Sequence, residues 1–279
     1  MVDLDKISTE QRNAASVHID KVSTLEMVTI INNEDRKVPA AVSKILPEIA
    51  KAVDVISERL SKGGRLFYLG SGTSGRLGVL DAAECPPTYS TAPELVQGLI
   101  AGGSKAMFIA QEGAEDSEQL GREDLQSKAL TTNDVVVGLT ASGRTPYVLG
   151  GLRYAKTLGV TTISIACSQH PVVGEFADIS LVALVGPEVV TGSTRMKAGT
   201  AQKLILNMLS TGTMIKLGKV YSNLMVDVKP TNLKLKERAR RIVMTLADCD
   251  KETAHKALLK VGGNVREAID LLLGEHHDQ

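Results

Sequence analysis

The stretch LFYLGSGTSGRLG, residues 66–78, joins an apolar run to a loop of glycine, serine and threonine. Its first four residues are continuously apolar, which is typical of a strand buried on both faces of a parallel sheet. The residues after Gly75 are compatible with a helix. A strand, a glycine-rich loop and a helix in this order predict an α/β fold whose loop approaches a ligand closely.

Short apolar, β-branched runs recur along the middle of the chain at 134–140, 161–167 and 178–184. Helix-like stretches separate several of them, and glycine, serine, threonine or proline follows each one. We therefore predict an α/β fold with a doubly wound parallel sheet between two helical layers, a three-layer αβα sandwich. Residues 94–103 are ambiguous, and we expect a short strand or loop around 97–101 with a helix after 105.

Helical patterns flank this region. Residues 22–62 space Val, Ile and Leu at three and four positions, and 192–220 contains a long amphipathic pattern rich in Leu, Met and Ala. At about 235–275, three short helical patterns resemble a ubiquitin-associated-type three-helix bundle. Asn264 is the expected N-cap of its last helix, with Glu267 as the capping-box partner.

Composition narrows the classes of function. Lys+Arg and Asp+Glu each number 32 among 279 residues, so the formal net charge is zero. This balance argues against nucleic acid or an anionic membrane surface as a partner. Cys85, Cys167 and Cys249 lie far apart, which argues against a disulfide framework or zinc site and indicates a cytoplasmic protein. No stretch approaches the ~18–20 apolar residues of a membrane span.

A second stretch, LTASGRTP at 139–146, repeats the chemistry of the first loop. Both have small hydroxyl residues where a parallel strand is expected to end, which is the edge at which doubly wound sheets bind ligands. Glycine lets the backbone approach an anion, and hydroxyl and helix N-terminal N–H groups donate to phosphate oxygens. Two such loops favour one shared phosphate. The alternative is two ordinary turns between a strand and a helix.

A nucleotide site fits the first loop less well. Gly70, Gly72 and Gly75 match the GxGxxG spacing, but no strand-ending acid follows about 20 residues later. Glu84 comes only nine residues after Gly75 and lies in ECPPTY, which we expect to be a loop beyond the helix. A Walker loop would need Gly-Lys-Ser/Thr, and the sequence contains none.

Three longer stretches, at 69–89, 138–156 and 186–232, closely resemble the N-acetylmuramic acid 6-phosphate etherases. The most specific matches are ECPPT and GPEVVTGSTRMKAGTAQK. That family has the sugar isomerase (SIS) fold, and the resemblance covers nearly the whole chain. It implies N-terminal helices at 1–56, a SIS sugar-phosphate domain at 57–220, and a C-terminal helical region at 221–279 that includes the ubiquitin-associated-like unit.

The resemblance also implies an activity and its ligands. The family removes D-lactate from the C3 ether of N-acetylmuramic acid 6-phosphate to give N-acetylglucosamine 6-phosphate, in cell-wall amino-sugar recycling. By similarity to SIS domains, we expect five residues to bind the phosphate, namely Thr73, Ser74, Thr140, Ser142 and Thr145. We expect no metal or redox cofactor. Because SIS domains commonly pair across their sites, we also expect a homodimer.

Ether cleavage of this kind needs an acid and a base. In the ring-opened sugar the C2 proton is α to the C1 aldehyde, so a base can remove it while an acid protonates the departing C3 oxygen. Water then adds to the unsaturated sugar. The resemblance maps Glu84 to the proton donor and Glu115 to the second acid/base. Without it, Glu115 fits an acidic helix N-terminus, whereas Glu84 has no such simple explanation.

Three other charged residues have alternative interpretations. Glu188 follows the run at 178–184 and corresponds to a catalytic Glu of related SIS isomerases. We expect it to bind the substrate, orienting the sugar or acting as base, with helix capping as the alternative. Lys197 and Lys203 either pair with the lactate carboxylate or the phosphate, or remain solvated on a helix.

Two other functions stay open. One is a SIS-type sugar-phosphate isomerase, which would use base chemistry at C2 without expelling lactate. The other is a non-catalytic phosphosugar-sensing regulator. A transcriptional regulator should carry a basic helix-turn-helix, which the N-terminal sequence does not display, and a glucokinase-regulator-like protein should carry a second SIS repeat.

Overall fold

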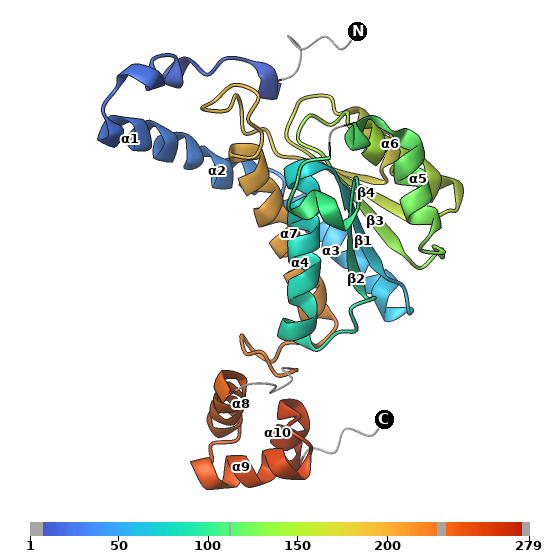
Figure 1. The fold of residues 1–279 in the computed structure, drawn as a ribbon. Coiled ribbons are helices and arrows are strands. Elements are labelled where there is room, and N and C mark those ends of the chain that lie inside the picture. The colour runs from blue at the N-terminus through green and yellow to red at the C-terminus, as the bar shows by residue number, and fades with distance from the viewer. Residues whose placement is uncertain (1–7, 112, 228–232, 275–279) are drawn as a thin grey trace. The chain divides into compact units, whose positions relative to one another are not determined.

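A parallel five-stranded sheet forms the centre of the computed structural model, which describes residues 8–111, 113–227 and 233–274 (Figure 1). The strands lie in the order β2-β1-β3-β4-β5, and every neighbouring pair is parallel. Their bounds are β1 Leu66–Gly70, β2 Val96–Ile100, β3 Val135–Leu139, β4 Thr161–Ala166 and β5 Ile179–Val182. The predicted doubly wound parallel sheet is confirmed.

The central strands β1 and β3 are buried at every position, which explains their continuous apolar sequences. The edge strand β2 contains Gln97 and Gly98 and is only partly buried, so its short apolar pattern was ambiguous in the sequence. The segment after it also differs from expectation. Instead of a helix after residue 105, the chain forms a single 3-10 turn, Ser104–Met107.

Helices cover both faces of the sheet, so the three-layer sandwich is confirmed (Figure 1). Helices α5 and α6 pack together on one face, and α3, α4 and α7 cover the other. The bounds are α3 Leu46–Ser61, α4 Gly72–Tyr89, α5 Glu118–Gln126, α6 Pro146–Thr157 and α7 Lys197–Lys216. Gly121 allows α5 and α6 to approach closely, because a Cβ there would lie 1.9 Å from the Tyr147 carbonyl oxygen.

The N-terminal segment contains helices α1 and α2, Thr24–Asp35 and Lys37–Ser43. Further short 3-10 helices span Ser8–Glu10, Ala14–Ser16, Ile19–Lys21, Ala114–Asp116 and Val172–Phe176. None of the helices in the described part of the chain has the length and apolar composition needed to cross a bilayer.

Helix α4 corrects the prediction for ECPPTY. We expected a loop past the helix, but α4 continues through Glu84, Pro86 and Pro87 to Tyr89. Proline lacks the N–H of a helical hydrogen bond, yet its fixed φ is compatible with a helix. The two prolines lie in the last turn, so the helix continues only to Tyr89 beyond them.

The three tail helices are α8 Leu233–Leu246, α9 Lys251–Lys260 and α10 Val265–Leu273. They share an apolar core that includes Val243, Ala257 and Ile269. Asn264 caps α10 as expected, because its Oδ1 accepts a hydrogen bond from the Glu267 backbone N–H. In return, the Glu267 carboxylate accepts a hydrogen bond from the Asn264 side-chain amide. The expected C-terminal three-helix bundle is therefore confirmed.

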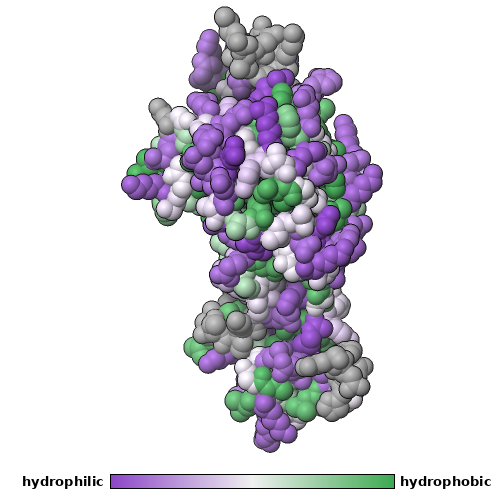
Figure 2. Space-filling view, turned by 90° about the vertical axis from the view of Figure 1, so that its right-hand side faces the viewer, coloured by the Kyte–Doolittle hydropathy of each residue, from purple (hydrophilic) through white to green (hydrophobic). Residues whose placement is uncertain are grey.

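Two compact units share the chain. One comprises Met1–Ala83 and Glu94–Thr213, and the other comprises Glu84–Pro93 and Met214–Gln279. On the face shown in Figure 2, hydrophobic residues form small patches within a mainly hydrophilic surface, as is usual for exposed protein surface.

Candidate active site

The carboxyl ends of three neighbouring strands lie in one row. In the registers of the sheet, Gly70 at the end of β1 pairs with Ile100 of β2 on one side and Leu139 of β3 on the other. The chain leaves β1 toward β2 and later returns to β3, so strand order reverses here. Such a topological switch point is where open α/β sheets bind ligands.

The first loop turns sharply from β1 into α4. A Cβ on Gly70 would lie 2.8 Å from the Gly75 nitrogen, and one on Gly75 would lie 2.7 Å from the Gly70 carbonyl oxygen. Gly72 has a φ of +51°, a conformation that favours glycine. These glycines bring the loop backbone against the start of α4, whose first-turn N–H groups have no helical acceptor.

Thr73 and Ser74, two of the predicted phosphate ligands, lie in the first turn of α4. Both face the start of α7. A Cβ on Gly199 would lie 3.4 Å from the Thr73 methyl, and the Ser74 hydroxyl donates to Gln202 Oε1 at 2.9 Å. Gln202 is 1% exposed, and its Nε2 has no hydrogen-bond partner in the described part of the chain. Helix α7 therefore supports the first loop from behind.

The second loop is held by its own hydroxyl groups. Thr140 Oγ1 lies 2.8 Å from Thr145 Oγ1 and 3.4 Å from Ser142 Oγ, and it accepts the Gly143 N–H at 3.2 Å. Ser142 Oγ accepts the Arg144 N–H at 3.3 Å. The three predicted phosphate ligands of this loop therefore form one cluster immediately after β3.

Glu115 lies beside the first loop, because its carboxylate accepts a hydrogen bond from the Ser71 hydroxyl at 3.3 Å. It belongs to the 3-10 turn Ala114–Asp116 and is exposed. A cavity of about 150 Å³ opens at this point, lined by Ser71, Gly72, Arg76, Ala106, Ala110 and Glu115, among others. Segments that follow β1 and β2 thus meet at one cavity.

Glu84 occupies a different position from the one expected. It is exposed on α4, eleven residues after Thr73, which corresponds to a rise of about 16 Å along the helix at ~1.5 Å per residue. The sequence predicted it in a loop just beyond the helix. In the structure, a regular helix separates it from the first loop of its own chain.

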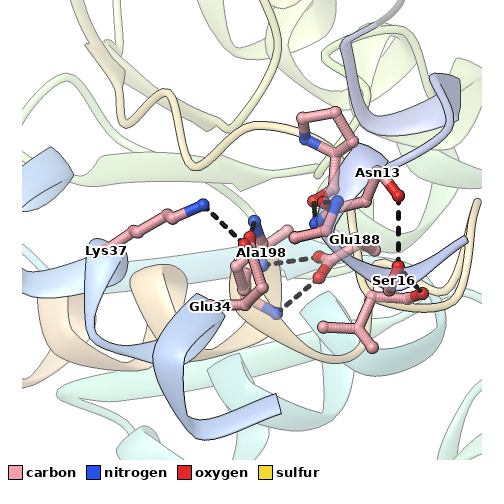
Figure 3. Close-up of polar contacts among 10 residues, drawn as sticks. Asn13, Ser16, Glu34, Lys37, Glu188 and Ala198 are labelled. Atoms are coloured by element: carbon pink, nitrogen blue, oxygen red, sulfur yellow. Dashed lines mark hydrogen bonds and ion pairs between the residues drawn. The ribbon is translucent and has the colours of Figure 1, made fainter. Parts of the chain in front are cut away.

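Glu188 caps α7. It is fully buried, and its two carboxylate oxygens accept the N–H groups of Lys197 and Ala198, each at 2.9 Å (Figure 3). Burial raises the pKa of this carboxyl group, although the two hydrogen bonds and the Lys197 charge oppose the shift. The capping alternative therefore describes its contacts, and substrate binding by Glu188 stays a prediction.

Lys197 is neither solvated nor free for a ligand. It is 1% exposed and pairs with Glu34 at 2.7 Å. Burial raises the pKa of Glu34, but hydrogen bonds from Lys197, Lys37 and Asn13 outweigh that effect and bring it down to about 2. Figure 3 shows Glu34 and Glu188 close together at the start of α7. Both alternatives weighed for Lys197, a substrate ligand and a solvated lysine, are wrong.

Arg76, Gln202 and Glu34 were not singled out in the sequence. Arg76 directly follows the glycine loop, so its position alone could have drawn attention to it. Gln202 and Glu34 contact residues far away in the chain, and no local pattern indicates such contacts. Within the described residues, no group of three or more His, Cys, Asp or Glu side chains is arranged to hold a metal ion.

Known protein families match two parts of the chain. A model of the glucokinase regulatory protein N-terminal SIS domain matches residues 48–156. A model of the C-terminal lid domain of glucokinase regulatory protein matches residues 222–271. The first match covers β1, both hydroxyl loops and Glu115, and the second covers the three tail helices.

Curated relatives match almost the whole chain. It is 60% identical over 274 residues to the N-acetylmuramic acid 6-phosphate etherase of Clostridium beijerinckii, covering 98% of this chain and 90% of the relative. This chain belongs to the N-acetylmuramic acid 6-phosphate etherase family. The etherase of Aeromonas hydrophila is 57% identical over 272 residues, covering 98% of this chain and 91% of the relative.

Among solved structures, a phosphoheptose isomerase from Francisella tularensis has a TM-score of 0.52 at 14% identity, covering 70% of this chain and all of that one. At this identity the likeness concerns the fold alone, and the expected SIS fold is confirmed. The residues that distinguish an etherase from an isomerase must be sought in the site itself.

Proposed function

We propose that this protein is a carbon-oxygen lyase that cleaves the D-lactyl ether of N-acetylmuramic acid 6-phosphate. The products are N-acetylglucosamine 6-phosphate and D-lactate. One observation carries the proposal: a chain 60% identical to a named etherase has two hydroxyl loops and Glu115 at the ends of three adjacent strands. This edge offers donors for a phosphate beside a carboxylate for proton transfer.

The sugar phosphate binds between the two loops. Backbone N–H groups at the start of α4 supply donors to one side of the phosphate, with the hydroxyls of Thr73 and Ser74 beside them. Thr140, Ser142 and Thr145 supply hydroxyls from the adjacent loop. The main support is the register of β1 and β3, because paired positions on neighbouring strands are only ~5 Å apart.

The reaction is an elimination followed by an addition. After the sugar ring opens, a carboxylate takes the C2 proton and the electron pair of that bond forms the C2–C3 double bond. The C3–O bond breaks, and the departing lactate oxygen receives a proton from a carboxylic acid. Water then adds at C3 and a proton returns to C2. We assign these acid and base steps to Glu84 and Glu115.

We further propose that the two carboxyl groups of one site come from two copies of the chain. The rise of about 16 Å along α4 between Thr73 and Glu84 exceeds the separation of phosphorus and C3 in a hexose 6-phosphate. Glu115, by contrast, contacts the first loop of its own chain. A homodimer in which Glu84 of the second copy approaches the loop would complete the site.

We propose a cytoplasmic location for this reaction. Cys85, Cys167 and Cys249 form no disulfide among the described residues, and Cys85 and Cys167 are buried. Burial raises the pKa of the Cys167 thiol to about 12, so it is poorly reactive. Cysteines kept as thiols instead of disulfides are typical of a reducing compartment.

The activity is tested by incubating the purified protein with N-acetylmuramic acid 6-phosphate and measuring D-lactate. We expect stoichiometric D-lactate and N-acetylglucosamine 6-phosphate. Absence of lactate, with the substrate recovered intact, would contradict the proposal. A ketose phosphate formed without lactate would favour the isomerase alternative, and binding of the phosphosugar without any turnover would favour the regulator.

A further inference from the structure

The cavity beside Glu115 has the size of a substituent and not of a whole sugar. Its volume of about 150 Å³ is below the ~300–1,000 Å³ of typical small-molecule sites. Ala101, Ala106 and Ala110 give it a small apolar wall. Among the described residues that line it, Arg76 is the only cation and Glu115 the only carboxylate. The cavity therefore combines a methyl-sized apolar surface with one basic and one acidic side chain.

The Arg76 guanidinium has a fixed orientation. Its Nε donates to the Met107 carbonyl oxygen at 3.0 Å, and its Nη2 donates to the Ala106 carbonyl oxygen at 2.7 Å. These neutral acceptors hold the side chain but leave its charge uncompensated. Among the described residues, no carboxylate forms an ion pair with Arg76. Of the five N–H donors of an arginine, three remain for a ligand.

The proposed substrate has one group that matches this cavity. Its C3 lactyl ether carries a carboxylate and a methyl group, and the product lacks both. A guanidinium binds a carboxylate through two parallel hydrogen bonds. Lys197, which the sequence offered for this role, is committed to Glu34 and buried.

We propose that Arg76 binds the carboxylate of the lactyl group and so distinguishes substrate from product. This inference rests on the proposed function and adds a specificity determinant to it. The lactyl methyl packs on the three alanines, and the ether oxygen lies on the Glu115 side of the cavity. Once the ether is cleaved, the sugar loses this contact and the lactate can leave.

The alternative ligand of Arg76 is the phosphate of the sugar. A lactyl carboxylate and a phosphate ligand predict different results when Arg76 is replaced. Arg76→Gln should be compared with wild type for the KM of N-acetylmuramic acid 6-phosphate. The Ki of N-acetylglucosamine 6-phosphate, acting as a competitive inhibitor, should be measured in the same assay. If Arg76 binds the lactyl carboxylate, we expect kcat/KM to fall roughly 10- to 100-fold while Ki stays within about twofold. Arg76→Lys should retain part of the affinity, because it keeps the charge but not the planar donors.

Arg144→Gln is the matched control, because Arg144 also borders a hydroxyl loop but does not line the cavity. It should leave the ratio of KM to Ki unchanged. A parallel rise of KM and Ki in Arg76→Gln would overturn the proposal, since a phosphate ligand or a damaged loop affects both sugars. An unchanged KM would overturn it too.

If Arg76→Gln has no measurable turnover, the binding of N-acetylglucosamine 6-phosphate, measured by calorimetry, tests the proposal instead. Retained product binding supports the proposal, and lost binding contradicts it. Failure of the proposed function is a separate result, because the wild-type protein would then release no lactate.

Discussion

At the N-terminus of α7, three charged side chains are almost excluded from water. Glu188 binds the backbone N–H groups that open the helix, and Lys197 pairs with Glu34 from α1. Because α7 also contacts the first loop through Gly199 and Gln202, this cluster stabilises the wall behind the proposed phosphate site. Its charges fix the start of α7 through hydrogen bonds and an ion pair.

Removing one partner of this cluster should be costly. Lys197→Met keeps the aliphatic stem but leaves the carboxylate of Glu34 buried, with the exposed Lys37 as its remaining ion-pair partner among the described residues. We expect the free energy of unfolding to fall by roughly 3–5 kcal/mol in denaturant titrations. Lys62→Met is the control, because its pair with Glu58 is exposed on both sides, and it should change stability by less than ~1 kcal/mol. Equal effects would contradict the buried ion pair.

Removing either proposed catalytic carboxyl group should lower turnover without weakening ligand binding. Glu84→Gln and Glu115→Gln keep the size of the side chain but remove proton transfer, so each should lower kcat roughly 10²–10⁴-fold. The dissociation constant of N-acetylglucosamine 6-phosphate, measured by calorimetry, should stay close to wild type. Glu118→Gln, an exposed neighbour paired with Arg153, is the control and should remain active. Near-normal turnover in either variant would remove that residue from the mechanism.

At the scale of elements, polar side chains connect α4 and α7 at the interface between the two helices. Ser74 meets Gln202 near the loop, and Asp81 receives hydrogen bonds from Ser210 and from Tyr68 of β1 at 3.0 and 2.9 Å. Burial raises the pKa of Asp81 to about 6, although these hydrogen bonds and the charge of Lys203 oppose the shift. The interface between α4 and α7 therefore contains a carboxyl group, that of Asp81, which titrates just below neutral pH.

The Asp81 carboxyl should make stability depend on pH in a defined direction. Its pKa is higher in the folded chain than the 3.8 of a free aspartate, so its ionisation opposes folding as pH rises from about 4 to 6. Asp81→Asn removes that ionisation; one hydroxyl partner can still donate to the amide oxygen, and the other can rotate to accept from the amide N–H. We expect the variant to be about 1–3 kcal/mol more stable than wild type at pH 7.5, with a smaller difference at pH 4.5.

Chemical denaturation at the two pH values measures this difference. Asp20→Asn, at an exposed position, should give the same stability as wild type at both. An advantage of Asp81→Asn that stays constant or grows on acidification would show that the ionisation of Asp81 is not its cause.

The elements differed in how well the sequence predicted them. The strands β1 and β3 follow directly from continuous apolar runs, because full burial favours apolar residues at every position. Strand β4 is buried as well, but it contains Thr162 and Ser164. Helix α4 was predicted to end too early, because Pro86 and Pro87 resemble a stop signal although they lie within its last turn. The sequence predicted a doubly wound parallel sheet but not the order of its strands, because pairing between distant strands has no local sequence pattern.

The site residues show the same division. The two hydroxyl loops could be located because loops at the ends of parallel strands have a recognisable composition, whereas the phosphate-binding roles of Thr73, Ser74 and the hydroxyls after β3 rest on resemblance and stay predictions. The partner of Lys197 was not, because Glu34 precedes it by 163 residues and approaches only in the folded chain. Glu84 was chosen by resemblance, and its catalytic role stays a prediction; its distance from the first loop depends on the true length of α4.

At the scale of the whole molecule, shared sites predict complementation between inactive variants. If Glu84 acts in the site of the other copy, a mixed dimer of Glu84→Gln and Glu115→Gln chains contains one intact site. Refolding the two inactive proteins together should then restore roughly a quarter of wild-type activity, because half of the dimers are mixed. Mixing should restore nothing if both carboxyls belong to the same copy, and that result would contradict the shared site.

The central claim is that this chain breaks the C3–O bond of the sugar by elimination and then adds water. The most direct measurement follows the hydrogen and the oxygen of that water. Wild-type enzyme acts on N-acetylmuramic acid 6-phosphate in deuterated, oxygen-18-labelled water. Mass spectrometry should find deuterium at C2 and oxygen-18 at C3 of N-acetylglucosamine 6-phosphate, with D-lactate retaining the original ether oxygen. Oxygen-18 in the lactate and none at C3 would contradict the account, because the bond broken would then be the one on the lactyl side.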